Sequence, residues 1–539
     1  MSSLGRSTRA MALGTVASRG TGFLRTAVIV AVLGVEGVGA AYTIANTTPN
    51  IVYELLLGGL LTSVVVPLLV RAAKDDADGG LAYAQRLLTL TVLVLAGAAV
   101  LLVVAAPLLI DLYAGDLSPE ARDLAVLLAR FFLPQLLFYG AGAVLGAILN
   151  TRGSYAPPMW APVLNNLVVI ATGLVFLLVR SGQAVSVGSL TDGQIALLGI
   201  GTTLGIVAQT VALLPALRAA GVPLRPRFDL RGTGLGKAGR LAKWVLLYVV
   251  ANQLAYIVVV NLSSSQELLD AGRGYPSYVA AYVLWQLPHA VVAVSIITAL
   301  LPRMSRAAAD GRTQDLRASL DRGLRLTAVV LVPASVALVV LGREVAVLVF
   351  ARGEVSVADA RFIGLLLGVF AVGLVPFSLY QLQLRAFYAM QDTRTPTLVN
   401  LGVNATLVTV DLVLFAVLPD DVRVVGLAAG HATSFAVGLL VCSVVLSRRV
   451  GGLDVAIVVR TVVRCLLAVL LPAVLAGLLA AGATRVVGDG PLGAAAALAL
   501  GGAVLAGGYV LLARRLRVPE VDEVVRPVLA RLPLRRGRA

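Results

Sequence analysis

Long uncharged apolar stretches recur from one end of the chain to the other. The twenty residues TVLVLAGAAVLLVVAAPLLI, from Thr91 to Ile110, contain no charged side chain. A helix needs about 20 predominantly apolar residues to cross the hydrocarbon core of a bilayer. Only 13% of the 539 residues are charged and the mean hydropathy is +0.93, whereas soluble globular chains carry about 25% charged residues. The sequence therefore predicts an all-α polytopic membrane protein.

Fourteen segments are long and apolar enough to be transmembrane helices. They are residues 11–34, 41–70, 87–112, 123–149, 157–180, 194–217, 241–263, 276–301, 324–350, 361–390, 396–418, 424–447, 461–483 and 491–513. An even number of spans puts both ends of the chain on the same side of the membrane.

The distribution of Lys and Arg predicts which side that is. Of the 44 Lys and Arg, 32 fall in the two terminal segments and in alternate loops, and eight fall in the opposite loops. Cytoplasmic loops carry the excess of Lys and Arg. We therefore expect a multi-pass protein of the cell (plasma) membrane with both termini in the cytoplasm.

Several function classes are disfavoured by composition and spacing. The formal charge of +16 resides in short loops and the C-terminal segment, so we expect no nucleic-acid binding. Cys442 and Cys465 fall in or beside apolar segments and are expected to be buried, unpaired side chains. His289 and His431 are far apart and predict no metal site. The predicted external loops contain no Ser/His/Asp constellation, so we expect no enzyme.

Two pairs of sequence blocks indicate an internal duplication. VPLLVRAAKDDADG at 66–79 resembles LPRMSRAAADG at 301–311, at an offset of 235. AILNTRGSYAPPMWAPVLNN at 147–166 resembles AFYAMQDTRTPTLVNLGVN at 386–404, at an offset of 239. Helices 1–6 would then correspond to helices 7–12. Because six is even, we expect two six-helix lobes related by a pseudo-two-fold axis along the membrane normal, with two extra C-terminal helices.

The duplication defines the predicted domains. Residues 1–220 form the N-lobe, residues 221–450 the C-lobe, and residues 451–515 helices 13 and 14. Residues 516–539 form a basic cytoplasmic tail that either binds anionic lipid headgroups or only anchors the topology. Transporters built from such repeats hold their substrate between the lobes near the membrane midplane.

Two arginines within the first span are the main candidates for a binding site. Arg19 and Arg25 lie about 12 and 21 Å along the helix from Met11 and differ by about 240° in azimuth. A charge at the bilayer centre is costly, but a guanidinium facing a wet cavity suits a phosphate or carboxylate. Arg25 is therefore a candidate anion-binding residue; the alternative is an interhelical pair with Glu54 or a carbonyl group. For Arg19 a binding role and a structural role are equally plausible.

Other polar residues extend this candidate site. Glu54 and Asp411 are the carboxylates well inside predicted spans, where either could bind a proton or Na⁺ or pair with an arginine. Arg130 lies in helix 4, and Asn50 could line a polar lumen or bridge helices. The second span contains Pro49, and its repeat partner, the eighth span, also contains a proline; each could mark a gate or an ordinary kink.

The motifs SRGTGFLR in helix 1, NTTPN in helix 2, LPRMSRAAADG after helix 8 and DTRTP before helix 11 resemble the MurJ (MviN) family. The resemblance covers essentially the whole chain and is most similar to actinobacterial members. It implies membership of the multidrug/oligosaccharidyl-lipid/polysaccharide exporter (MOP) superfamily and a flippase for lipid II, the undecaprenyl-pyrophosphate-linked peptidoglycan precursor. It also implies a cationic central cavity for the headgroup, and a groove for the lipid tail on helices 13 and 14.

The family pattern carries over at four positions. Arg19 and Arg25 match its helix-1 arginines, and Pro49 and Asn50 match its helix-2 Pro-Asn.

The chain departs from the family pattern where Thr26 replaces an acid and where Tyr53 and Val283 replace arginines. The cavity would then be less cationic, which leaves two alternatives. Either Arg130 or Arg273 substitutes, or the lipid-linked substrate differs.

The expected function is therefore lipid II translocation from the inner to the outer leaflet by alternating access, with no cofactor. Coupling to the membrane potential, Na⁺ or H⁺ is left open. The alternatives are a flippase for another polyprenyl-linked glycan, a cation-coupled drug exporter of the same superfamily, or a scaffold for cell-wall enzymes. The expected partners are lipid II or a similar glycolipid, membrane lipids and possible cell-wall synthesis proteins, with the protein acting as a monomer.

Overall fold

The computed structural model describes the chain except residues 1–2, 56–65, 181, 183–184, 230–234 and 530–539. The described residues are folded into helices and loops, without a β-strand. They form two compact units. Unit 1 comprises residues 1–276 together with residues 353–355, and unit 2 comprises residues 277–352 and 356–539.

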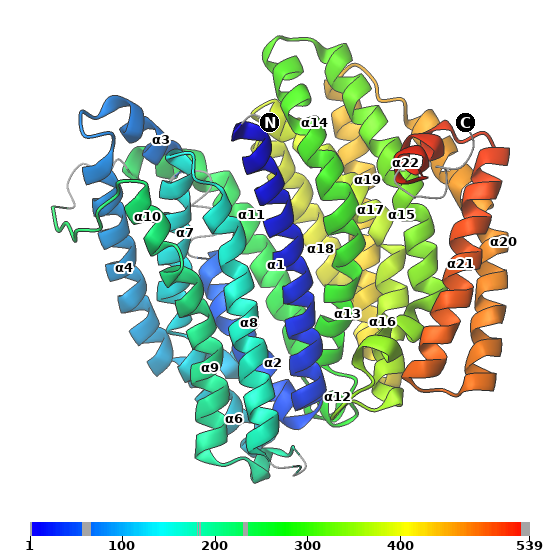
Figure 1. The fold of residues 1–539 in the computed structure, drawn as a ribbon, viewed down its shortest axis with the longest axis horizontal. Coiled ribbons are helices and arrows are strands. Elements are labelled where there is room, and N and C mark those ends of the chain that lie inside the picture. Colours follow the sequence, from blue (N-terminus) through cyan, green and yellow to red (C-terminus); the bar gives the residue numbers. More distant parts are fainter. Residues whose placement is uncertain (1–2, 56–65, 181, 183–184, 230–234, 530–539) are drawn as a thin grey trace, which may run out of the picture. The chain divides into compact units, whose positions relative to one another are not determined.

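In unit 1, α1 packs along α8, α8 packs on α9 and α2 packs on α6 (Figure 1). Its helices are α1 (Ser3–Leu33), α2 (Gly37–Tyr53), α3 (Val66–Asp75), α4 (Leu81–Val104), α5 (Ala106–Ala114), α6 (Pro119–Phe132), α7 (Gln135–Thr151), α8 (Ala156–Val179), the short η3 (Val187–Ser189), α9 (Asp192–Val211), α10 (Leu214–Ala219), α11 (Leu235–Leu262) and α12 (Gln266–Asp270).

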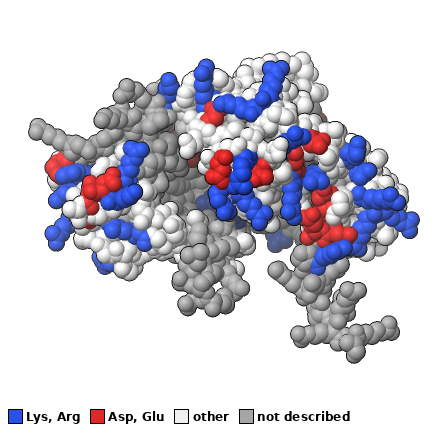
Figure 2. Space-filling model, turned by 90° about the horizontal axis from the view of Figure 1, so that it is seen from above, with Lys and Arg blue, Asp and Glu red and all other residues white. Residues whose placement is uncertain are grey.

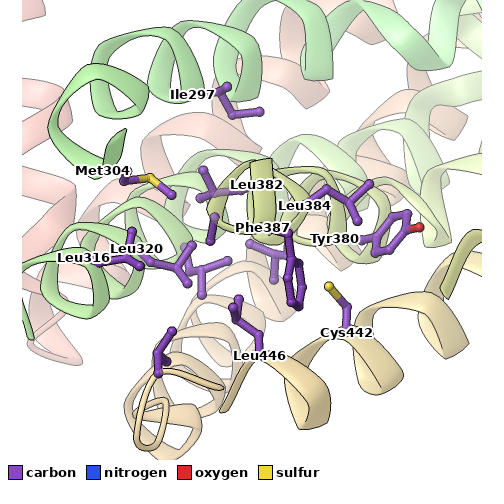
Figure 3. Close-up of a cluster of buried hydrophobic side chains, with 14 of the residues drawn as sticks. Ile297, Met304, Leu316, Leu320, Tyr380, Leu382, Leu384, Phe387, Cys442 and Leu446 are labelled. Carbon is purple, nitrogen blue, oxygen red and sulfur yellow. The ribbon is translucent and has the colours of Figure 1, made fainter. Parts of the chain in front are cut away.

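Unit 2 is centred on the long helix α15, which contacts α14, α16, α17, α20 and α21. Its helices are α13 (Tyr275–Pro288), η4 (His289–Ala293), α14 (Val294–Ala309), α15 (Thr313–Phe350), α16 (Val357–Val372), α17 (Leu374–Ala389), α18 (Arg394–Val417), the short η5 (Asp420–Val422), α19 (Arg423–Arg449), α20 (Val455–Val487), α21 (Pro491–Arg515) and α22 (Pro519–Leu529). One apolar core joins α14, α15, α17 and α19; Met304, Phe387 and Leu446 belong to it (Figure 3).

The membrane-spanning helices agree with the sequence prediction. Twelve helices among the described residues are long and apolar enough to cross a membrane, and a thirteenth span is the pair α16 and α17, bent by 46°. The predicted span 41–70 coincides with α2 in its first half, and its residues 56–65 lie outside the described part of the chain. The predicted span 87–112 is broken at Ala105, where α4 ends and α5 begins.

The helices containing Pro49 and Pro288 are distorted in the same way. Residues 54–55 directly after α2 are π-helical, and so is η4 directly after α13. Pro49 and Pro288 are 239 residues apart, which is the offset of the second pair of repeated blocks. Single π turns within α-helices occur frequently at functional sites. This shared distortion supports the predicted duplication, while the lobe boundary at residue 220 and the pseudo-two-fold axis stay predictions.

The C-terminal segment differs from the basic tail predicted for residues 516–539. Its described part contains α22, which has acidic residues in its first turn. Glu520 pairs with Arg325 and Glu523 pairs with Arg322, both on α15. The segment therefore begins with an acidic helix docked on unit 2. The positive charges that suggested a tail lie mainly beyond residue 529, outside the described residues.

Candidate functional site

The two arginines of α1 lie on different sides of the helix. Arg25 is half-buried and Arg19 is exposed. Asn166 on α8 donates from Nδ2 to the Ser18 carbonyl oxygen at 3.2 Å and to Thr21 Oγ1 at 3.0 Å. These bonds fix the rotation of α1 against α8. Arg25 is seven residues beyond Ser18, so it lies on the same face, toward the interior of unit 1.

The aromatic hydroxyls of two neighbouring helices lie within electrostatic range of Arg25. Its charge acts on the hydroxyl groups of Tyr42 on α2 and Tyr139 on α7. The Tyr42 hydroxyl also lies 2.8 Å from Thr202 Oγ1 on α9. No hydrogen bond or ion pair of the Arg25 guanidinium is found among the described residues. The N–H donors of Arg25 are thus not used by the described residues, which suits the binding of an anionic ligand.

The candidate residues of α2 do not neutralise Arg25. Pro49 is buried, and Asn50 is exposed and donates from Nδ2 to the Asn46 carbonyl oxygen at 3.0 Å. Glu54 is exposed where α2 becomes π-helical, and within the described side chains it makes no ion pair. The alternative of an Arg25–Glu54 pair is therefore absent from this conformation.

Arg130 also belongs to unit 1. It is exposed in the last turn of α6, three residues before the start of the short link to α7. The positions that depart from the family pattern have ordinary local contacts. Thr26 Oγ1 donates to the Gly22 carbonyl oxygen at 3.2 Å, the rings of Tyr53 and Tyr139 are 5.5 Å apart, and Val283 is half-buried.

Unit 2 contains an apolar groove of about 820 Å³. We call it the α20 groove, because α20 forms one wall and α15, α17 and α19 form the others. Its α20 wall consists of Val455, Val458, Val459, Val462, Val463 and Leu466. The resemblance predicted a tail groove on helices 13 and 14. These two helices are α20 and α21. Among the described residues, α20 lines the groove, whereas α21 packs against α20 and does not line it.

A few polar groups interrupt the α20 groove. Gln383 Nε2 donates to Ser443 Oγ at 2.7 Å. The side-chain oxygen Oε1 of Gln383 is buried and has no hydrogen-bond partner among the described residues. Asp321, Ser447 and Arg448 also line it. The groove therefore combines long valine and leucine walls with few charges, which suits a hydrocarbon chain rather than a sugar.

Asp411 on α18 is a buried carboxylate without a counter-charge. Its side chain is fully buried, and neither carboxylate oxygen has a hydrogen-bond partner among the described residues. A Cβ atom added at Gly430 on α19 would collide with Asp411 Oδ1, so only glycine leaves room for this carboxylate. Sequence reasoning left open a proton, Na⁺ or an arginine as its partner, and no arginine among the described residues pairs with it.

Metal and disulfide chemistry have little basis in the described residues. A search of these residues finds no group of three or more His, Cys, Asp or Glu that could hold a metal ion. Cys442 and Cys465 are both buried and free.

Comparison with solved structures identifies the class of fold. The chain is similar to a structure described as lipid II flippase MurJ in an inward closed conformation, with a TM-score of 0.74 and 18% identity over 94% of this chain and 99% of that one. It is also similar to an inward-facing multidrug resistance MATE family transporter of the MOP superfamily, with a TM-score of 0.64, 16% identity and coverage of 80% and 94%. The fold is thus that of a polytopic helical membrane protein.

Sequence comparison then gives the family. The family model for lipid II flippase MurJ matches residues 29–493. A probable lipid II flippase MurJ of Vibrio cholerae is 28% identical over 431 residues, which is 78% of each chain. The lipid II flippase MurJ of Burkholderia cenocepacia is 28% identical over 399 residues, covering 72% of this chain and 74% of that one. The chain belongs to the lipid II flippase MurJ family and is a multi-pass protein of the cell membrane.

The structure adds residues that sequence reasoning missed. Tyr42 and Tyr139 come within electrostatic range of Arg25 because α2 packs against both α1 and α7, and no local motif marks them. The Gln383–Ser443 pair likewise joins α17 to α19. Since the matched region starts at residue 29, Arg19 and Arg25 lie outside it, and their binding role stays a prediction.

Proposed function

We propose that this protein translocates lipid II, or a closely similar polyprenyl-pyrophosphate glycolipid, from the inner to the outer leaflet by alternating access. Family membership supports the substrate class. The main support for the proposal is the half-buried Arg25. Its guanidinium has no hydrogen-bond or ion-pair partner among the described residues of unit 1. Desolvating a cation is costly, and an incoming pyrophosphate would offset that cost by charge-assisted hydrogen bonds.

In this mechanism no covalent bond changes, and the protein is not an enzyme. Arg25 neutralises the pyrophosphate, while Arg19, on another side of α1, and Asn50 and Arg130 offer further donors to the polar head. The prenyl chain stays in an apolar environment along the α20 groove. The π turns that follow Pro49 and Pro288 supply bending points in repeat-related helices. The protein acts as a monomer and needs no cofactor.

We propose that both termini face the cytoplasm. The predicted cytoplasmic loops carry most of the Lys and Arg, and Figure 2 shows Lys and Arg side chains, with Asp and Glu among them, on one end of the molecule. We further propose that an ion gradient or the membrane potential drives the cycle, with Asp411 as the group that binds a proton or Na⁺.

Purified protein reconstituted into liposomes containing labelled lipid II tests this function. We expect the wild-type protein to move lipid II between leaflets, and Arg25→Ala to slow this by at least about tenfold, equivalent to roughly 1.4 kcal/mol. Arg361→Gln is the matched control, since Arg361 pairs with exposed Asp489. Equal translocation with and without protein would refute the proposal.

The rival function is a cation-coupled drug exporter, favoured by the likeness to MATE transporters and by buried Asp411. It predicts that Asp411→Asn and Glu54→Gln abolish export of a cationic dye while Arg25→Ala has little effect. A flippase for another polyprenyl-linked glycan would move that glycolipid in the liposome assay in preference to lipid II.

A further inference from the structure

The α20 groove has one charged end and is largely apolar elsewhere. Asp321, near the start of α15, and Arg448, near the end of α19, line it where α20 begins. At the same end, the Leu453 backbone N–H donates to Ser447 Oγ at 3.1 Å. All of these residues belong to unit 2. The sequence predicts that this end faces the cytoplasm, because its loops are rich in arginine.

The groove is about as deep as one leaflet of a bilayer. On α20 its wall runs from Val455 to Leu466, which is roughly 16 Å at 1.5 Å per residue. On α15 its apolar wall runs from Leu324 to Val339, roughly 22 Å. A leaflet consists of about 15 Å of hydrocarbon, or about 20 Å with its headgroups. A lipid in the groove would therefore have its chains along the apolar walls and its headgroup at the charged end.

Arg448 is an unpaired cation at the charged end. Its side chain is exposed, and it makes no ion pair or hydrogen bond among the described residues. Its neighbour Arg449, by contrast, is paired with Asp392. A guanidinium binds phosphate oxygens by charge-assisted hydrogen bonds. Arg448 is therefore a suitable contact for the phosphate of a lipid headgroup.

Asp321 is an incompletely paired carboxylate at the same end. Its side chain is only 15% exposed, and Oδ2 lies 3.6 Å from Arg317 Nε, which is too long for a hydrogen bond. Its other oxygen, Oδ1, is buried and has no hydrogen-bond partner among the described residues. A shielded carboxylate with unused acceptor sites favours a positively charged donor. An ammonium group in a lipid headgroup would supply one.

The charges around Asp321 are balanced. Besides its arginine partner, the charges of Arg325 and Asp454 act on its carboxylate, and Arg325 is itself paired with Glu520. Arg448 and the arginine partner of Asp321 are thus offset by Asp321 and Asp454. A pyrophosphate, which is strongly anionic, would find no excess of cations here. A headgroup that carries both a phosphate and an ammonium matches this end of the groove.

We propose that the α20 groove binds an aminophospholipid of the inner leaflet. Its phosphate lies at Arg448, its ammonium group at Asp321, and its acyl chains along α15 and α20. The lipid occupies the groove until the prenyl chain of lipid II displaces it. Binding of the aminophospholipid is independent of the proposed function, whereas its displacement by lipid II rests on that function.

Native mass spectrometry of the purified full chain tests the lipid site. The protein is incubated in detergent with equal amounts of phosphatidylethanolamine, phosphatidylcholine and phosphatidylglycerol that have the same acyl chains. We expect phosphatidylethanolamine to bind at least about tenfold tighter than phosphatidylcholine, because a quaternary ammonium cannot donate a hydrogen bond. This preference is measured on the wild type, so the test does not depend on whether a variant folds.

Three variants then separate the contacts. Asp321→Asn should reduce the preference for phosphatidylethanolamine over phosphatidylcholine to about twofold or less, because the charged acceptor is lost. Arg448→Gln should weaken the binding of all three phospholipids by about three- to tenfold. Val459→Trp should prevent binding, because its indole fills the groove. The controls Asp421→Asn and Arg361→Gln, at exposed positions of the same unit, should leave binding unchanged.

Two results would overturn the proposed lipid site. Equal binding of the three phospholipids would show that the groove recognises only hydrocarbon. Binding of lipid II without any retention of phospholipid would show that the groove accepts only the prenyl chain.

Adding lipid II to the loaded protein tests displacement. It should release the bound phosphatidylethanolamine, and a complex that holds both lipids would contradict the exchange. If phosphatidylethanolamine binds as expected but the protein does not translocate lipid II in liposomes, the proposed function fails and the lipid site stands.

Discussion

The guanidinium of Arg325 on α15 lies 2.7 Å from the carboxylate of Glu520 on α22, and the Glu520 side chain is only 6% exposed. Val518 and Val521 flank Glu520 and are buried in an apolar cluster with residues of α15, α20 and α21. The segment after the last span is therefore part of the folded core of unit 2, and it braces the helices that form the α20 groove.

Removing the Glu520 carboxylate should destabilise the protein. Glu520→Gln leaves Arg325 partly buried without its counter-charge, and we expect the free energy of unfolding to fall by about 1–3 kcal/mol. Glu523→Gln is the matched control, because the Arg322–Glu523 pair is 55% and 49% exposed and such surface pairs contribute about 0–1 kcal/mol. Thermal unfolding in detergent measures both changes. Equal losses would show that burial of Glu520 is unimportant.

Asp392 in the loop between α17 and α18 should make stability pH-dependent. Burial raises the pKa of this carboxyl, but hydrogen bonds from Thr395 and the charge of Arg449 outweigh it and hold the pKa below 3.8. Arg449 Nη1 donates to Asp392 Oδ2 at 2.6 Å. A lowered pKa in the folded state stabilises the fold above the ordinary pKa.

The stabilisation by Asp392 is therefore complete at neutral pH, and it is lost as the pH falls below 3.8 through the lowered pKa. We expect Asp392→Asn to be less stable than the wild type at pH 6, with the difference shrinking only in that acidic range. Unfolding curves over pH measure it. A difference that does not change with pH would show that the charge of Asp392 is unimportant.

Replacing Asp411 should raise the stability of the protein and impair the coupling of transport to an ion gradient. Burying an unpaired charge destabilises a fold more than burying a neutral amide of the same shape, so Asp411→Asn should raise the unfolding temperature. The same change should make lipid II translocation insensitive to an imposed Na⁺ or pH gradient. The control is Asp421→Asn, at an exposed loop position of the same unit. Retained gradient dependence would remove Asp411 from coupling.

The α20 groove offers a prediction about the lipid tail. Val459→Trp would fill the groove, and we expect it to reduce lipid II translocation by about tenfold, equivalent to roughly 1.4 kcal/mol. Val474→Trp is the control, since Val474 is also exposed on the same helix but does not line the groove. Reconstituted transport at equal protein levels compares them. Equal rates would exclude the groove from tail binding.

Much of the fold is predictable because a bilayer imposes a simple rule. Each span must be apolar over about 20 residues, and that rule finds α1 and α20 as readily as the bent pair α16 and α17. Hydropathy gives no signal for the break at Ala105, because residues 91–110 contain no charged side chain. The local signal is Pro107 in the first turn of α5, which a count of apolar residues ignores. The acidic helix α22 is short, and its place depends on pairing with distant Arg325 rather than on local composition.

The site is only partly predictable, because the sequence shows which residues are charged but not what surrounds them. A charge inside an apolar segment is conspicuous, so Arg25 and Asp411 stand out in the sequence. Their surroundings do not. Tyr139 near Arg25 depends on packing between helices. The Arg180–Glu354 pair is a further example, because sequence reasoning used Arg180 only to count loop charges and did not consider Glu354.

The most direct test is conditional depletion of this protein in its own cell. Plasmid copies supply the wild type, Arg25→Ala or Arg25→Lys at equal expression. The measurement is the amount of lipid II that is accessible from outside the cell. Depletion should leave lipid II in the inner leaflet, and the wild type should restore outer exposure. Arg25→Ala should not restore it, and Arg25→Lys should do so only in part. Unchanged outer exposure after depletion, or full rescue by both variants, would contradict the account.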